Sequence, residues 1–79
     1  MKKVLIELLD EKGNVLDDTI VDGYRTLEGF LRYCKPKLRY MFHNPEKEKT
    51  TQLRLNWFMD SSQLYGKNYS RTKTIDFTF

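Results

Sequence analysis

Apolar residues concentrate in two segments at the start of the chain, separated by a short polar stretch. Lys3–Asp10 and Val15–Val21 are rich in valine, isoleucine and leucine, which favour extended backbone. Between them, Gly13 and Asn14 tolerate the positive φ angles that tight turns require. This pattern predicts an N-terminal β-hairpin with its turn at Glu11–Asn14.

The next segment is predicted to be helical because its apolar residues return at a helical period. Thr26 is a suitable N-cap after a second turn at Asp22–Arg25. The apolar positions that follow share a stripe about 120° wide on a helical wheel, and they are Leu27, Phe30, Leu31, Cys34, Leu38, Met41 and Phe42. Pro36 would cost about 3 kcal/mol in a straight helix, yet the stripe keeps its phase across it. We therefore expect either one kinked helix or two short helices, the second beginning at Pro36, with the end at Asn44-Pro45.

Alternation of apolar and polar residues predicts two further strands, Thr51–Met59 and Thr72–Phe79, after a solvated connector at Pro45–Lys49. The apolar face of these strands carries Leu53, Leu55, Trp57, Met59, Ile75, Phe77 and Phe79. The other face carries Gln52, Arg54, Asn56, Phe58, Thr74, Asp76 and Thr78. The two strands form a predicted hairpin whose turn is centred on Gly66, Lys67 and Asn68.

The predicted elements follow one another in the order β-β-α-β-β, within a single domain of residues 1–79. The simplest arrangement is an α+β fold, a four-stranded antiparallel sheet with the helix packed on one face. The apolar face of the C-terminal strands then meets the apolar stripe of the helix. The opposite face, with Arg54, Asn56 and Phe58, is expected to be partly open to solvent or to a partner.

Charge divides the chain into two unequal parts. Residues 1–31 hold four Lys or Arg against seven Asp or Glu, a balance of −3, whereas residues 32–79 hold ten against four, a balance of +6. The second part also contains nine of the eleven aromatic residues. A basic segment interleaved with aromatic rings is equipped to meet an anionic surface, so the composition favours a binding role for residues 32–79.

The predicted helix carries one candidate contact surface. Arg32, Lys35 and Arg39 fall, together with His43, within about 80° on one flank of the apolar stripe. Such a ridge can contact phosphates, each contact adding to a salt-dependent affinity. The competing interpretation is a solvated helix face whose long side chains lie along the edge of the core.

The outer sheet face and the tip of the C-terminal hairpin form a second candidate surface. Tyrosines beside a glycine-containing turn with Lys and Arg can stack on nucleic-acid bases, and they can equally anchor a protein interface. The alternative is a cross-strand pair of Tyr65 with Tyr69 that only stabilises the turn. The candidate binding residues outside the helix are Arg54, Phe58, Tyr65, Lys67, Tyr69 and Arg71.

Few residues suit catalysis or metal binding. Cys34 is the only cysteine and His43 the only histidine, which argues against a structural zinc site and against disulfides. The helical phase of Cys34 predicts burial and an unreactive thiol, and His43 lacks the partner that positions a general base. We expect no catalytic site, no cofactor and no metal. A lone cysteine is typical of a reducing, cytoplasmic compartment.

These features favour a small non-enzymatic binding protein, an inhibitor, adaptor or regulator that docks on a larger protein or nucleoprotein, of a size common among phage and mobile-element proteins. An alternative is a nucleic-acid-binding domain that uses the basic helix flank and the hairpin tip, although a net charge of +3 is low for that role. A remote alternative is a small RNase-type toxin. A charged fraction of 32% excludes a membrane span, and exposed sheet edges permit a monomer or a homodimer.

Overall fold

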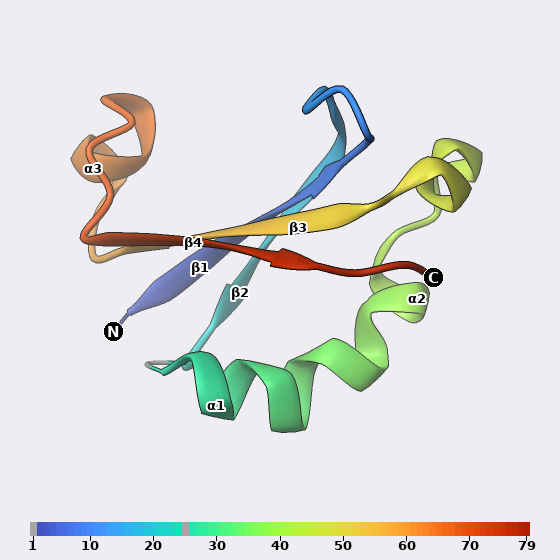
Figure 1. Ribbon diagram of the computed structural model, residues 1–79. Helices are drawn as coiled ribbons and strands as arrows, with labels where there is room; N and C mark the ends of the chain where they lie inside the picture. Colours follow the sequence, from blue (N-terminus) through green and yellow to red (C-terminus); the bar gives the residue numbers. More distant parts are fainter. Residues whose placement is uncertain (1, 25) are drawn as a thin grey trace.

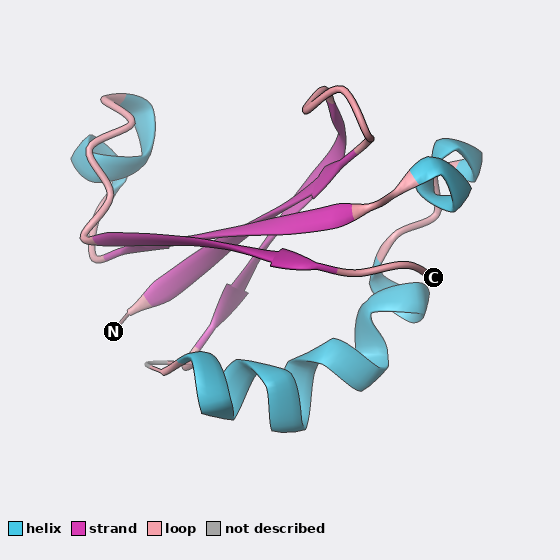
Figure 2. Cartoon of the chain, viewed as in Figure 1, coloured by secondary structure: helices cyan, strands magenta, loops and turns pink. Residues whose placement is uncertain are grey.

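Four strands form one antiparallel sheet in the computed structural model, which describes residues 2–24 and 26–79 (Figure 1, Figure 2). In spatial order the strands are β2 (Val15–Asp22), β1 (Lys3–Leu9), β3 (Gln52–Phe58) and β4 (Arg71–Asp76). One 15-residue helix connects β2 to β3 and covers one face of the sheet. The predicted α+β fold and its β-β-α-β-β order are confirmed. Arg25, part of the second predicted turn, lies outside the described residues, as does Met1.

The two central strands, β1 and β3, supply the sheet side of the core. Alternate residues of both strands point toward the helix and are buried, namely Val4, Ile6, Leu8, Leu53, Leu55 and Trp57. The helix and the residue after it contribute Phe30, Cys34, Leu38 and Phe42. The indole N–H of Trp57 donates to the carbonyl of Tyr24 at 2.6 Å, so its polar atom is satisfied inside an apolar core.

The helix passes through Pro36 without breaking. Its backbone runs through α1 (Leu27–Gly29), η1 (Phe30–Cys34), η2 (Lys35–Lys37) and α2 (Leu38–Met41). Pro36 has no N–H to donate, and its ring collides with the carbonyl four residues earlier in a regular α-turn. The backbone just before it forms a π-turn, in which the N–H of Lys35 donates to the carbonyl of Phe30. Of the two predicted alternatives, the single helix is the one observed.

Two segments contain helical structure that the sequence pattern did not predict. Pro45–Lys49 is a 3₁₀-helix (η3), capped by the side chain of Asn44, which accepts from the N–H of Glu46 at 2.9 Å. The predicted open turn after β3 contains α3 (Ser61–Tyr65) instead.

Helix α3 has a reciprocal cap at its start. The carboxylate of Asp60 accepts from the N–H of Gln63 at 3.1 Å, and the side chain of Gln63 accepts from the N–H of Met59. The positive φ angle of this segment is at Lys67 (55°), whereas Gly66 has an ordinary φ of −79°. The predicted glycine-centred hairpin turn is therefore wrong in its details.

Four residues differ from their predictions in whether they are buried or exposed. Met59 was predicted to lie on the apolar face of its strand, but β3 ends at Phe58 and Met59 is 51% exposed. Leu31 is 36% exposed because the π-turn alters the angular spacing of the apolar stripe. Conversely, Asn56 and Phe58 are buried rather than open to solvent, since the Asn56 amide is hydrogen-bonded to Glu7 and Phe58 lies beside Leu64 of α3.

Candidate docking surface

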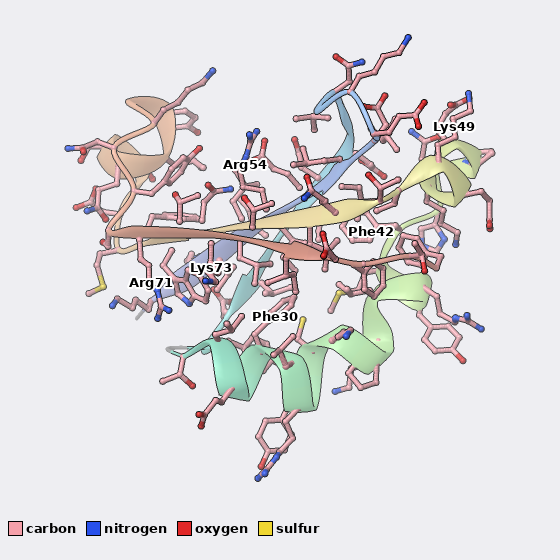
Figure 3. The ribbon with its side chains drawn as sticks, viewed as in Figure 1. Phe30, Phe42, Lys49, Arg54, Arg71 and Lys73 are labelled. Carbon is pink, nitrogen blue, oxygen red and sulfur yellow. The ribbon has the colours of Figure 1, made fainter. Side chains whose placement is uncertain are left out.

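The predicted contact residues lie on opposite sides of the sheet. Figure 3 shows Arg54 on one side of the strands, and Arg71 and Lys73 on the side that faces the helix. The register agrees, because Arg71 lies opposite Trp57, whose side chain is in the core. Arg32, Lys35 and Arg39 are all exposed on the helix side. The structure thus divides the predicted contact surface into two separate areas.

Arg54 takes part in a polar network on the sheet face away from the helix. Its Nε and Nη2 donate to the two carboxylate oxygens of Glu7 at 2.7 and 3.0 Å. The amide of Asn56 donates to Oε1 of Glu7 at 2.7 Å and to the carbonyl of Leu5 at 3.2 Å, while its oxygen accepts from the Thr72 hydroxyl at 3.1 Å. The guanidinium of Arg54, aided by the Asn56 amide, holds the pKa of Glu7 below its ordinary value of 4.5.

This network leaves little on the outer sheet face for a partner. The guanidinium of Arg54 and the side-chain amide of Asn56 are both hydrogen-bonded to Glu7, and Phe58 is only 3% exposed. The remaining residues of this area lie beside α3, where Tyr65 is 82% exposed, Lys67 is exposed and Tyr69 is half-buried. Tyr65 lies in α3, so the cross-strand pair with Tyr69 is not formed.

The helix side contains a surface groove of about 470 Å³ between the second half of the helix and the C-terminal segment. Lys35 Nζ lies 5.7 Å from the ring centre of Phe77, and Lys47 Nζ lies 5.7 Å from that of Phe79, within cation–π range. The two rings meet edge to face at 4.9 Å. We call this surface the basic-aromatic groove, and its residues are Lys35, Arg39, Tyr40, Lys47, Phe77 and Phe79.

Backbone contacts fix the shape of the basic-aromatic groove. Lys47 Nζ donates to the carbonyls of Arg39 and Phe42 at 3.2 and 3.0 Å, so a side chain of η3 satisfies carbonyls at the end of α2. The N–H of Phe77 donates to the carbonyl of Thr51 at 3.0 Å, which extends the pairing of β3 with the C-terminal segment beyond β4. The aromatic wall is therefore anchored to the sheet and the basic wall to the helix.

Lys35 and Arg39 are the exposed cations of the basic-aromatic groove and are open to anionic groups, whereas Lys47 is half-buried and donates to two backbone carbonyls. Three ion pairs occur within residues 2–24 and 26–79, and they join Lys3 to Asp22, Lys49 to Glu46 and Arg54 to Glu7. None of these pairs uses Lys35, Arg39 or Lys47. Tyr40, at 74% exposure, adds an aromatic ring next to Arg39 that is available for contact.

Covalent chemistry and metal binding find little support in the side chains. Burial raises the pKa of the Cys34 thiol, so it stays protonated near neutral pH. The described part of the chain holds no cluster of three or more His, Cys, Asp or Glu that suits a metal ion. Within the same residues, no helix is both long enough and apolar enough to cross a membrane.

Comparison of the chain with protein families, with curated proteins and with solved structures finds no match. The sequence pattern identified Lys35 and Arg39 as contact residues but assigned Phe77 and Phe79 to the core alone, where they are only half-buried. One signal indicates that these two rings also line a contact surface. Phe77 and Phe79 lie on the same face of an edge strand, where no further strand lies beside them to bury both rings completely. Lys47 carried no such signal, because its place depends on the fold of η3.

Proposed function

We propose that this chain is a small binding protein that docks through the basic-aromatic groove onto an acidic surface of a larger protein or nucleoprotein. The observation that carries the proposal is the pairing of unneutralised cations with half-exposed aromatic rings in one anchored groove. Cations and aromatic rings held side by side can pair with carboxylates and bury apolar groups together. Arg and Tyr are also the residue types that dominate binding energy at protein interfaces.

The division of the cations favours a protein partner over a nucleic acid. Arg54 is paired with Glu7 on one side of the sheet, while Lys35 and Arg39 lie on the helix that covers the other side, so the positive charge is not one continuous stripe. A net charge of +3 gives a weak long-range attraction to phosphates. Nucleic-acid binding is therefore treated as a competing outcome of the test.

The proposal assigns no chemical step to the chain. Cys34 is buried and protonated, and Glu7, the carboxylate nearest to a candidate site, is engaged by Arg54 and Asn56. The free cysteine also suits a reducing compartment, so we place the proposed complex in the cytoplasm.

Charge reversal in the basic-aromatic groove tests the proposal. Tagged wild-type chain, a Lys35→Glu/Arg39→Glu variant and a Lys67→Glu/Tyr65→Ala control are used to capture proteins from a nuclease-treated lysate, with identification by mass spectrometry. We expect a protein that is enriched by the wild type and by the control but lost with the groove variant. The control matters because it removes a cation and an aromatic ring from the opposite side of the sheet.

A labelled single-stranded and a labelled duplex oligonucleotide, each at two salt concentrations, provide the second arm. Salt-dependent binding that Lys35→Glu/Arg39→Glu abolishes, without any captured protein, would replace the proposal by the nucleic-acid alternative. Capture that is equal for all three chains would contradict the assignment of the groove.

A further inference from the structure

The two edges of the sheet differ in how well they are protected against pairing with another strand. On β2, the carbonyl of Leu16 accepts from the side chain of Asn44 at 3.1 Å, and the N–H of Asp18 donates to the carboxylate of Asp17 at 2.8 Å. The β2 edge also carries three carboxylates and no cation, so two copies of it repel each other. Charged groups of one sign and covered backbone are means by which proteins protect edges.

The β4 edge lacks this protection. Every residue of β4 except Ile75 is exposed, and the strand carries two cations and one carboxylate. The N–H of Phe77 points to β3, where it donates to Thr51. Since the backbone groups of an antiparallel strand alternate in direction, those of Thr72, Thr74 and Asp76 point away from the sheet.

From this geometry we infer that β4 pairs antiparallel with β4 of a second copy of this chain, with Thr74 on the two-fold axis. Thr74 then lies opposite Thr74 of the other copy, and Thr72 lies opposite Asp76. All three outward-pointing residues fall at hydrogen-bonded positions, which joins two four-stranded sheets into one. A symmetric two-fold contact of this kind is the commonest form of homo-oligomer.

Side chains and charges match in this register. On the helix side, Lys73 lies opposite Ile75 and Arg71 lies opposite Phe77, so no two like charges face each other directly. On the outer face, Asp76 lies opposite Thr72, so each carboxylate meets a hydroxyl rather than another carboxylate. A register with residue 73 on the two-fold axis would place Lys73 opposite Lys73 of the other copy, and the repulsion between these two cations disfavours it.

The inference rests on other observations than the proposed docking role, and the two surfaces meet at Phe77, while Lys35, Arg39 and Tyr40 do not belong to the β4 edge. A dimer would nevertheless display two basic-aromatic grooves in one assembly. Two grooves on one particle allow bivalent attachment to a repeated or dimeric partner.

Molar mass measured as a function of concentration tests the dimer. We expect sedimentation equilibrium of the wild type to show a rise from the 9.5 kDa of one chain toward twice that value. Thr74→Pro removes an outward N–H without breaking the bond to β3, and should raise the dissociation constant by about tenfold or more. The matched control is Ile20→Pro, at an outward-pointing position of β2, which should leave the dissociation constant unchanged; circular dichroism verifies that both variants fold.

Cross-linking tests the register. In an air-oxidised sample, Thr74→Cys should form a disulfide-linked dimer, because the two copies of residue 74 lie about 5.5 Å apart between Cα atoms. Thr72→Cys should not, because its copies are about 14 Å apart, offset by four residues along the paired strands. A wild type that remains one chain in mass up to about 1 mM, loss of the dimer in Ile20→Pro alone, or cross-linking of Thr72→Cys that equals that of Thr74→Cys would each overturn the inference.

Discussion

The two faces of the sheet solve the same burial problem by different means. Toward the helix, Ile6 and Leu55 lie in a core built from apolar side chains alone. The other face does not pack against the long helix. There, the side chains of Glu7, Arg54 and Asn56 form hydrogen bonds with one another. The first face gains free energy by removing apolar area from water, whereas the second keeps polar groups partly buried without leaving them unpaired.

This difference explains where a docking surface can lie. A polar network that is already satisfied gives a partner few unpaired groups, so the outer face contributes register and order to the sheet. On the helix side, Phe77 and Phe79 pack against the edge of the core and are only half-buried, and this edge is the rim of the core. Unpaired cations gather at that rim, which makes it the place where the protein and a partner can both gain contacts.

The largest expected effect comes from opening a cavity in the apolar face. Leu55→Ala should lower the free energy of unfolding by about 2–5 kcal/mol, because Leu55 is fully buried between the helix and the central strands. Urea titration followed by circular dichroism measures the change. The exposed Leu31→Ala should stay within about 0.5 kcal/mol, and equal losses in the two variants would contradict the described core.

The polar face is tested by a double-mutant cycle between its two charged residues. Glu7→Gln, Arg54→Met and the double variant should give a coupling energy of about 1–3 kcal/mol, since the pair is partly buried and joined by two charge-assisted hydrogen bonds. The same urea titrations supply the four values. A coupling near zero would mean that the network does not stabilise the fold.

Acid should distinguish the two faces further, since only the polar one titrates. The pKa of Glu7 is lower in the folded chain than its ordinary value of 4.5, so its stabilising contribution is complete above that pH and is lost as the pH falls through the lowered value. Wild type should therefore lose stability more steeply below pH 4.5 than Glu7→Gln. Asp10 and Asp60, whose pKa values are also lowered by hydrogen bonds, contribute equally to both curves. Parallel curves would contradict the role of Glu7.

The smallest expected effects on stability belong to the exposed tyrosines. Tyr40→Ala and Tyr65→Ala should each change the free energy of unfolding by less than about 0.5 kcal/mol, because both rings lie mostly in solvent. They should differ in capture experiments, where Tyr40→Ala weakens binding and Tyr65→Ala does not. A reversed result would move the docking surface to the side of α3.

The order of elements and the core were predictable because each rests on a local repeat. Alternation places Leu53, Leu55 and Trp57 on one face of a strand, and the helical period places Cys34 and Leu38 together; all five are buried. These periodic patterns are expected for any strand or helix that buries one face, whatever its neighbours are. The fold class could therefore be predicted from them.

The groove and the polar network were not predictable in the same way. Glu7 and Arg54 are 47 positions apart in the sequence and meet only through the pairing of β1 with β3. Likewise, Lys47 reaches Phe79 only because η3 folds beside the end of the helix. Asp60 and Gln63 were a missed local signal, since an acidic N-cap with Gln three positions later indicates a helix start.

The π-turn in front of Pro36 makes the orientation of the basic-aromatic groove depend on chain length. Such a turn holds one residue more than an α-turn, and each helical residue rotates the side chains beyond it by about 100°. Because the π-turn takes up this extra residue, Leu38 and Phe42 still point into the core, and Arg39 and Tyr40 stay beside the aromatic wall. A single-residue insertion or deletion that the backbone does not absorb in this way would turn the groove and these core residues together, and would therefore destabilise the fold as well as move the docking surface.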